Sequence, residues 1–270
     1  MNNILIIGCG HMGSALLEAW SKNRSYNFYV IDPLRFKKIN KKFKSKKIKS
    51  YRSIAEIKKT NSFDIVLVAI TPQIANESLK EYKFLNFKKS CLLVSIVAGK
   101  KIVFFNKFFP NIKQIVRVMP NMPALVGEGV SCMTSNNYVS KANKNKIQNL
   151  FSKIGLAIWL KSESDIDSAT AISGSGPGYV FYIINAMENA ANKLGLNKEL
   201  NRKIIFQTFL GSLKLQKKTK QTAEKLSNTI AIKGGTTEAG LKIMKKKNLN
   251  KIFSETLLSA YSKARELGKK

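Results

Sequence analysis

Residues 3–13 read Asn-Ile-Leu-Ile-Ile-Gly-Cys-Gly-His-Met-Gly, and this stretch decides the fold class. The apolar residues 3–7 predict a short buried strand. Gly8, Gly10 and Gly13 then form a G-x-G-x-x-G pattern, and apolar side chains on one face of the following residues predict a helix. Glycines at such a turn let the backbone approach a pyrophosphate, which binds at the helix N-terminus. The stretch therefore indicates a dinucleotide-binding unit.

A second predicted strand ends at Asp32, which lies 19 residues beyond Gly13. This is close to the spacing at which dinucleotide-binding folds carry an acidic residue. Asp32 is typical of a contact with the ribose 2′-hydroxyl of NAD. Arg35, Lys37 and Lys38 follow at once and could bind the 2′-phosphate of NADP, unless they only reflect the general excess of lysine. The sequence leaves NADH and NADPH both open.

Further apolar runs alternate with helical patterns along the next part of the chain. Residues 65–70, 91–96 and 115–119 each predict a buried strand that runs into a turn, and residues 157–160 predict the last strand. Near-continuous apolar strands separated by helices are typical of a parallel sheet covered on both faces. Ligands of such sheets bind at the carboxyl ends of the strands. We expect a doubly wound, Rossmann-type α/β domain over residues 1–161.

Strand signals stop after the polar residues 161–164, and residues 162–270 are expected to form a helical domain. Gly195 is expected to end one long helix and Asn197 to cap the next. Apolar positions on these helices cover more than one face, so the helices either pack tightly together or bury against another chain. An all-α substrate-binding and dimerisation domain is the favoured interpretation.

Two glycine-rich runs punctuate the helical part. Residues 167–179 read Asp-Ser-Ala-Thr-Ala-Ile-Ser-Gly-Ser-Gly-Pro-Gly-Tyr and are expected to form an interdomain loop at a helix start, or a close approach to a ligand. Residues 234–241 read Gly-Gly-Thr-Thr-Glu-Ala-Gly-Leu and predict a turn that opens a helix, with Thr236 or Thr237 as its cap. Backbone N–H groups at such a start bind anions such as a carboxylate. An ordinary cap without a ligand is the alternative.

The composition argues against several classes of protein. With 270 residues the chain suits one large or two ordinary domains, and no apolar run approaches the roughly 20 residues of a membrane helix. The first residues lack the features of a signal peptide. Cys9, Cys91 and Cys132 are far apart and odd in number, so neither a disulfide framework nor a metal site is expected. The expected location is the cytoplasm.

The formal net charge of +31 raises a nucleic-acid or membrane-surface role as an alternative. The lysines are spread over several stretches, and aromatic residues do not interleave with them as on a base-stacking surface. A solvated basic surface that attracts anionic ligands is therefore favoured over specific nucleic-acid binding. His11 is the only histidine, and its place in the glycine loop favours a loop or cofactor-facing role over that of a catalytic acid.

Four further motifs occur in order along the chain. They are Ser-Ile-Val-Ala-Gly at residues 95–99, Arg-Val-Met-Pro-Asn-Met-Pro at residues 117–123 with Val-Gly-Glu-Gly at residues 126–129, and the two glycine-rich runs above. With the opening glycine motif, they make the chain resemble pyrroline-5-carboxylate reductases over essentially its whole length. The resemblance implies reduction of L-1-pyrroline-5-carboxylate to L-proline, the last step of proline biosynthesis, with NADPH or alternatively NADH. It also implies a helical domain that intertwines in a homodimer, and dimers that often assemble to decamers.

The resemblance further implies which residues form the sites. The cofactor would be held by Ile7, Gly8, Cys9, Gly10, His11, Met12, Gly13, Asp32, Ala69, Ile70, Thr71, Pro72 and Ala98. The substrate pocket would be shaped by Met119, Pro120, Glu163, Thr170, Ser173, Gly235, Thr236 and Thr237. Thr237 occupies the family position that approaches the ring nitrogen, so its hydroxyl is the expected catalytic group.

The chain departs from the family pattern at three places. Thr71 stands where the family has a lysine near the cofactor, and Ile232-Lys233 replace Ser-Pro before the second glycine run. Residues 220–223, Lys-Gln-Thr-Ala, replace an acidic segment. Thr71 and Lys233 are the support for one alternative, a non-catalytic dinucleotide-binding regulator of the same fold.

The sequence shows no catalytic triad, metal cluster or pair of carboxylates. This fits a protonated cyclic imine as substrate, because such a group is already electrophilic and the protein has only to orient it, bind its carboxylate and exclude water. The rival enzyme class is a β-hydroxyacid dehydrogenase, which needs a lysine on the first long helix of its second domain. The predicted helix at residues 178–194 carries only Lys193, at its far end.

Overall fold

The computed structural model describes residues 2–43, 45–57, 62–85 and 87–268. Contacts between Cα atoms divide the chain into two compact units. The first unit comprises residues 1–175 and 260–270, and the second comprises residues 176–259. The domain boundary that we predicted after residue 161 stays a prediction.

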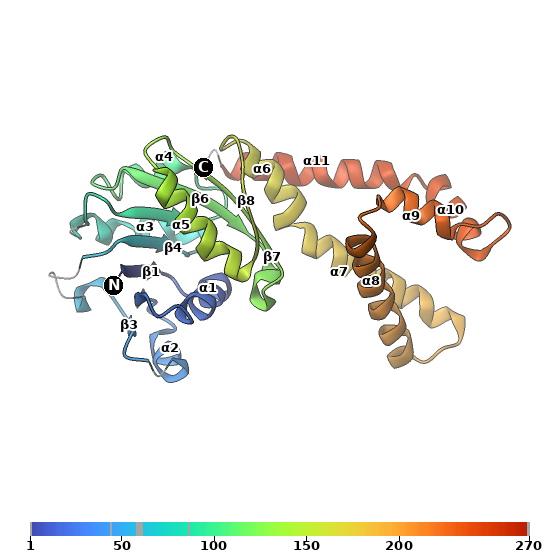
Figure 1. Cartoon of the computed structure of the whole chain (residues 1–270), viewed down its shortest axis with the longest axis horizontal. Coiled ribbons are helices and arrows are strands. Elements are labelled where there is room, and N and C mark those ends of the chain that lie inside the picture. The colour runs from blue at the N-terminus through green and yellow to red at the C-terminus, as the bar shows by residue number, and fades with distance from the viewer. Residues whose placement is uncertain (1, 44, 58–61, 86, 269–270) are drawn as a thin grey trace. The chain divides into compact units, whose positions relative to one another are not determined.

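The first unit is built on an eight-stranded sheet within the described residues. The strands are β1 Asn2–Ile7, β2 Tyr26–Ile31, β3 Ile48–Tyr51, β4 Ile65–Val68, β5 Leu92–Ser95, β6 Gln114–Pro120, β7 Gly129–Ser135 and β8 Gly155–Trp159. Their spatial order is β3-β2-β1-β4-β5-β6-β7-β8 (Figure 1). The order reverses between β1 and β4, as in a doubly wound fold, and the predicted fold class is confirmed.

The last two strands, β7 and β8, run opposite to the other six, which departs from the predicted parallel pattern. β7 was not predicted as a strand, and it runs antiparallel to β6. The connection between them is short and holds only the 3-10 helix η3, Met122–Val126. A parallel return needs a crossover of a dozen or more residues, so this connection can only reverse the direction of the chain.

Two hydrophobic cores lie on the two faces of the sheet. Side chains alternate between faces along each strand, so that Ile4 and Ile6 join one core while Leu5 and Ile7 join the other. Helices α1 His11–Ser21, α2 Phe36–Lys42 and α5 Lys141–Phe151 contribute to the first core. Helices α3 Pro72–Ser78 and α4 Ile102–Asn106 contribute to the second core. Because helices cover both faces of the sheet, the strands carry apolar side chains on both sides.

The run at residues 167–179 is helical, which corrects the expectation of a loop. Helix α6, Asp165–Ala169, passes into a single π-helical turn, η5, over Thr170–Gly174. Side-chain hydroxyls bond back to carbonyls one turn earlier, Thr170 Oγ1 to Ile166 and Ser173 Oγ to Ala169. Gly174 ends this turn, and Ser175 forms a bend before the next helix begins at Gly176. The extra residue of the π-turn marks a position that often serves function.

The second unit consists of helices. They are α7 Gly176–Ala191, α8 Lys198–Thr219, α9 Ala223–Ile230, α10 Thr236–Lys246 and the first part of α11 Leu249–Leu267, with a 3-10 turn at Asn192–Leu194. Gly195 adopts a φ of +84° after this turn, and the Asn197 side chain accepts a hydrogen bond from the Leu200 N–H. The predicted helix end and helix cap are confirmed.

Much of the apolar surface of the second unit is exposed in the single chain. Helices α7, α9 and α10 bury no residue, and Phe181, Phe206 and Leu213 are all more than 60% exposed. Exposed apolar side chains that gather on helices in this way are typical of a protein–protein interaction surface. The wide apolar pattern read from the sequence therefore has no cover within this unit, which leaves a second chain to supply it.

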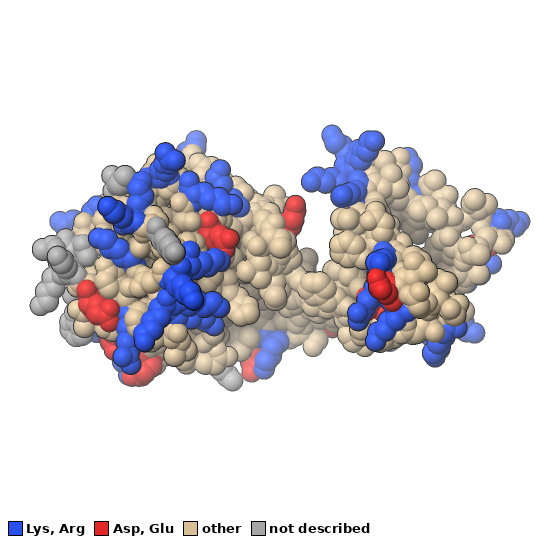
Figure 2. All heavy atoms as spheres, turned by 90° about the horizontal axis from the view of Figure 1, so that it is seen from below, with Lys and Arg blue, Asp and Glu red and all other residues tan. Residues whose placement is uncertain are grey.

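Basic side chains are distributed over the chain. On the face drawn in Figure 2, Lys and Arg gather in several separate groups, with acidic side chains beside some of them. Within the described residues, no helix is both long enough and apolar enough to cross a membrane.

Candidate active site

The first and third glycines of the opening motif are needed for packing. Gly8 has a φ of +87°, and a Cβ atom there would lie 2.6 Å from Ile70 Cγ2 and 2.7 Å from the Ala69 carbonyl oxygen. At Gly13, a Cβ would lie 2.6 Å from the Gly8 carbonyl oxygen. These glycines let α1 begin directly against the ends of β1 and β4.

The second glycine has a different environment. A Cβ atom at Gly10 would meet one described atom within 4 Å, Arg35 Nη1 at 3.5 Å. The first turn of α1 therefore faces open space at the point where a dinucleotide motif receives its pyrophosphate. The residues present fit a dinucleotide cofactor at this position.

Asp32 is buried, and both of its oxygens are occupied by backbone amides. Oδ2 accepts a hydrogen bond from the Cys9 N–H at 2.8 Å. Oδ1 accepts from the N–H groups of Leu34 at 3.0 Å and Arg35 at 2.9 Å. The carboxylate thus ties the glycine loop to the turn after β2. The Arg35 guanidinium lies 3.8 Å from it and is partly exposed.

A cavity of about 800 Å³ opens at the carboxyl ends of β1, β2 and β4, within the size range of ligand pockets. Eight of the predicted cofactor residues line it, namely Ile7, Gly8, Cys9, Gly10, Asp32, Ala69, Ile70 and Thr71. His11 lines a neighbouring cavity of about 280 Å³, together with Gly10, Arg35 and Lys38. The structure therefore brings most of the predicted cofactor residues together.

The remaining predicted cofactor residues lie outside this cavity wall. Met12 packs against the first core and Gly13 is buried in α1. Pro72 is the first residue of α3, and Ala98 follows β5 in the turn that ends at Gly99. Gly99 has a φ of +73°, and the end of α11 packs against it, so that a Cβ there would lie 3.0 Å from Leu267 Cβ.

Several lining residues were missed by the sequence analysis. Arg52 and Ser53 follow β3, Ile54 opens the next turn, and Leu34 and Ile74 supply exposed apolar side chains. Arg52 belongs to no sequence motif, because its position at the cavity depends on the pairing of β3 with β2. Only the sheet order brings its side chain to the same cavity as Arg35.

Four of the five predicted substrate residues of the first unit, Met119, Pro120, Thr170 and Ser173, lie at the end of β6 and in the π-turn. Met119 and Pro120 end β6, and a Cβ atom at Gly174 would lie 2.9 Å from Met119 Cε. The Asn121 side chain donates a hydrogen bond to the Ser173 carbonyl at 2.9 Å. Thr170 opens the π-turn and is half-buried. These residues form one wall.

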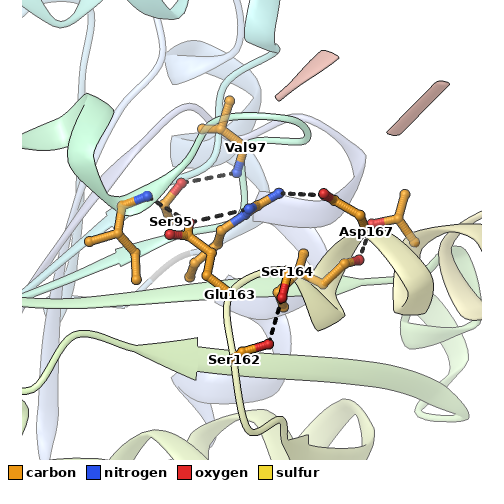
Figure 3. Close-up of polar contacts among 10 residues, drawn as sticks. Ser95, Val97, Ser162, Glu163, Ser164 and Asp167 are labelled. Carbon is orange, nitrogen blue, oxygen red and sulfur yellow. Dashed lines mark hydrogen bonds and ion pairs between the residues drawn. The ribbon is translucent and has the colours of Figure 1, made fainter. Parts of the chain in front are cut away.

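A buried arginine side chain lies on the same strand as Met119. Arg117 on β6 is only 3% exposed, and its guanidinium pairs with both Glu163 and Asp167, which are labelled in Figure 3. Nη1 is 3.2 Å from Glu163 Oε1, and Nη2 is 3.7 Å from Asp167 Oδ1. Glu163 Oε1 also accepts the Ile102 N–H at 2.8 Å. The sequence analysis gave no role to Arg117 or Asp167.

The cysteines of the site region are not activated as nucleophiles. Burial raises the pKa of the Cys9 thiol, although a hydrogen bond with Ser14 opposes the shift. Burial also raises the pKa of Cys132, against a hydrogen bond with Ser173. Since a thiolate is the reactive form, neither thiol is poised for covalent catalysis at neutral pH.

The second glycine run lies in the second unit and opens α10. Gly235 is the residue before the helix, and Thr236 and Thr237 are its first two residues, so the prediction that a threonine caps it is wrong. The Glu238 side chain instead accepts a hydrogen bond from the Gly234 N–H at 2.9 Å. Thr237 is half-buried and Thr236 is exposed. The N–H groups of this first turn have no carbonyl partner within the helix, because they open it.

Comparisons with known proteins agree over the whole chain. Residues 163–267 match a family model described as pyrroline-5-carboxylate reductase dimerisation. Residues 3–99 match one described as NADP oxidoreductase coenzyme F420-dependent. The pyrroline-5-carboxylate reductase of Aquifex aeolicus is 32% identical over 97% of this chain and 96% of its own. This chain belongs to the pyrroline-5-carboxylate reductase family.

Solved structures give the same result. A pyrroline-5-carboxylate reductase from Coxiella burnetii is 31% identical, with a TM-score of 0.87 over 100% of this chain and 99% of that one. A Plasmodium falciparum pyrroline carboxylate reductase with NADP bound is 30% identical, with a TM-score of 0.81 over 99% and 98%. The match of residues 163–267 to a dimerisation model confirms the predicted homodimer.

Proposed function

We propose that the chain reduces L-1-pyrroline-5-carboxylate to L-proline, the last step of proline biosynthesis. The main support is the cavity at the glycine loop, in a chain that matches a pyrroline-5-carboxylate reductase over nearly its full length. When bound, the nicotinamide supplies the hydride that the C=N carbon of the cyclic imine receives.

The preferred cofactor is NADPH, with NADH as the alternative. Gly8, Gly10 and Gly13 hold the pyrophosphate at the start of α1. Asp32 already accepts three backbone hydrogen bonds, which leaves it little capacity to bind a ribose hydroxyl. The guanidinium groups of Arg35 and Arg52 line the same cavity and suit a 2′-phosphate.

The substrate ring lies against the wall formed by Met119, Pro120, Thr170 and Ser173. The N–H groups at the start of α10, from Gly235 to Thr237, bind the substrate carboxylate. The Thr237 hydroxyl donates a hydrogen bond to the nitrogen of the neutral imine and relays to it a proton from solvent, which gives the protonated imine. Holding the ring in this way supplies most of the catalysis, because the protonated imine needs no further activation.

The homodimer forms through the exposed apolar helices of the second unit. We propose further assembly of these dimers to decamers on the family resemblance. We also propose a cytoplasmic location, which the three free cysteines support. Thr71 and Lys233, which differ from the family pattern, are both exposed, and Thr71 lines the cofactor cavity.

The test is oxidation of NADPH and NADH, followed at 340 nm, by the purified protein with L-1-pyrroline-5-carboxylate. We expect turnover in the range of about 1–1000 per second and a lower KM for NADPH. Binding of NADPH without any turnover would support a non-catalytic regulator and overturn this proposal.

Thr237→Ala tests the catalytic role. Loss of a hydrogen bond made at the reacting nitrogen should lower kcat about 100- to 1000-fold and leave the NADPH Kd unchanged. Thr229→Ala is the matched control, since Thr229 bonds to the Lys225 carbonyl on exposed α9 and should keep full activity. An unchanged kcat in Thr237→Ala would remove Thr237 from the mechanism.

A further inference from the structure

The ion cluster around Arg117 is a feature that the proposed reaction does not use. Among the described residues, Arg117 is the only Lys or Arg that is buried. It lies in the middle of the sheet, opposite Ser95 on β5 and Thr134 on β7. A buried guanidinium is costly unless it is paired, and the two carboxylate partners offset this cost.

The two carboxylates come from one short segment but hold different parts of the first unit. Glu163 precedes α6 and binds the Ile102 N–H, where α4 begins after the turn that follows β5. Asp167 lies within α6, one turn before Thr170 opens the π-turn. Arg117 is the shared partner of both.

The turn between β5 and α4, residues 96–101, is held at both ends. At its start, the Ser95 hydroxyl accepts a hydrogen bond from the Val97 N–H at 3.2 Å (Figure 3). At its end, the Ile102 N–H donates to Glu163. This turn carries Ala98, a proposed cofactor residue, so Glu163 acts on the cofactor side of the cluster.

Asp167 acts on the other side. Its neighbour Ile166 accepts the Thr170 hydroxyl at 2.7 Å, and Thr170 and Ser173 belong to the proposed substrate wall. Arg117 lies on β6, two residues before Met119. Its ion pair with Asp167 holds α6 in position next to this wall.

We propose that Arg117, Glu163 and Asp167 form a positioning cluster with divided roles. Glu163 sets the cofactor-side turn at residues 96–101, and Asp167 sets the substrate-side π-turn. Glu163 is then a positioning residue whose Oε1 is already shared by Arg117 and Ile102. The proposal rests on the proposed reductase function and adds to it the residues that align cofactor and substrate.

The test compares Glu163→Gln with Asp167→Asn, which keep size and remove one charge each. Direct binding is measured first, NADPH by its fluorescence and L-proline by calorimetry in the presence of NADP⁺. Glu163→Gln should raise the NADPH Kd about tenfold and change the proline Kd less than twofold. Asp167→Asn should do the reverse, and KM values for the two ligands should follow.

Ser95→Ala serves as the second variant, because it removes the hydrogen bond at the start of the same turn and keeps both carboxylate partners of Arg117. It should raise the NADPH Kd as Glu163→Gln does. Asp64→Asn is the matched control, since Asp64 also pairs with a cation, Lys88, at 2.8 Å. Asp64 directly precedes β4, so it lies at the amino-terminal ends of the parallel strands, whereas the cofactor cavity lies at their carboxyl ends. It should change neither Kd.

Equal changes of both Kd values in both charge variants, or a loss of thermal stability alone, would overturn the divided roles. Wild-type turnover separates this outcome from failure of the proposed function. If the wild type neither reduces the imine nor binds proline, the function and the Asp167 role fail together. The NADPH titrations of Glu163→Gln and Ser95→Ala then decide the Glu163 role by themselves.

Discussion

The two units of this chain solve the problem of burying apolar surface in different ways. In the first unit, strands β1, β4 and β5 are almost fully buried, and helices from the same unit cover both faces of the sheet. In the second unit, three of the helices bury no residue at all. The first unit therefore completes its own core, while the second needs a partner chain.

This difference shows which unit is stable by itself and which unit depends on dimer formation. The free energy of the first unit comes from packing within one chain and does not depend on protein concentration. The second unit gains its burial only in the homodimer, so its stability follows mass action.

The largest effect is expected from a charge on the apolar face of α7. Phe181 is 62% exposed in the single chain, and Phe181→Asp would place a carboxylate in the dimer interface. Burying an unpaired charge costs about 3 kcal/mol or more, so the dimer Kd should rise at least about 100-fold. Sedimentation analysis measures this.

Tyr138→Asp is the control, because Tyr138 is 68% exposed and lies in the first unit. It should leave the dimer intact. A Phe181→Asp protein that remains dimeric at the wild-type Kd would refute the assignment of this face to the interface.

The next effect concerns the core of the first unit. Leu16 on α1 is fully buried, and Leu16→Ala should lower the free energy of unfolding by about 2–5 kcal/mol. Both tryptophans, Trp20 and Trp159, belong to this unit, so tryptophan fluorescence during urea unfolding reports on it. The loss should be the same at low and high protein concentration.

Val103→Ala, at an exposed position of α4, should cost less than about 0.5 kcal/mol in the same assay. If the Leu16→Ala midpoint moved with protein concentration, the first unit would not be self-sufficient.

A smaller effect separates cofactor binding from folding. Gly10→Ala adds a methyl group that faces open space, so the protein should fold normally while the NADPH Kd rises about tenfold. Gly8→Ala should instead lower stability by about 1–3 kcal/mol, because of its positive φ and the close Ile70. Thermal melts and NADPH fluorescence distinguish the two; equal binding by Gly10→Ala and wild type would contradict the proposed pyrophosphate position.

The smallest effect is a pH dependence. Burial alone would raise the pKa of Asp64, but the Lys88 ammonium and the Asn3 amide together lower it below its usual value. The ionised carboxylate therefore stabilises the fold above the unfolded pKa of about 3.9, and this contribution is lost as pH falls through the lower folded pKa. Because Lys88 is partly exposed, Asp64→Asn should cost under about 1 kcal/mol at pH 7.

Urea unfolding of both proteins at pH 7 and near pH 2 measures this difference, which should shrink toward acid. A difference that grew as the pH fell would reverse the sign of the argument.

The sequence by itself determined the elements that depend on local chemistry. The glycine motif, the apolar runs and the Asn197 cap predicted the dinucleotide fold and the helix boundaries, because periodicity and backbone conformation are properties of adjacent residues. The motifs also identified the family. Local chemistry failed at residues 167–179, where glycines suggested a loop, because side-chain bonds to the backbone keep this run helical.

Only the tertiary structure decided which distant residues meet. Arg52 reaches the cofactor cavity because β3 pairs with β2, and Asp32 is occupied because three backbone amides converge on it. Arg117 received no role from its motif, since its partners Glu163 and Asp167 follow more than 40 residues later. The physical reason is that burial and pairing of charges depend on how strands and helices stack, and a single sequence shows spacing but not this stacking.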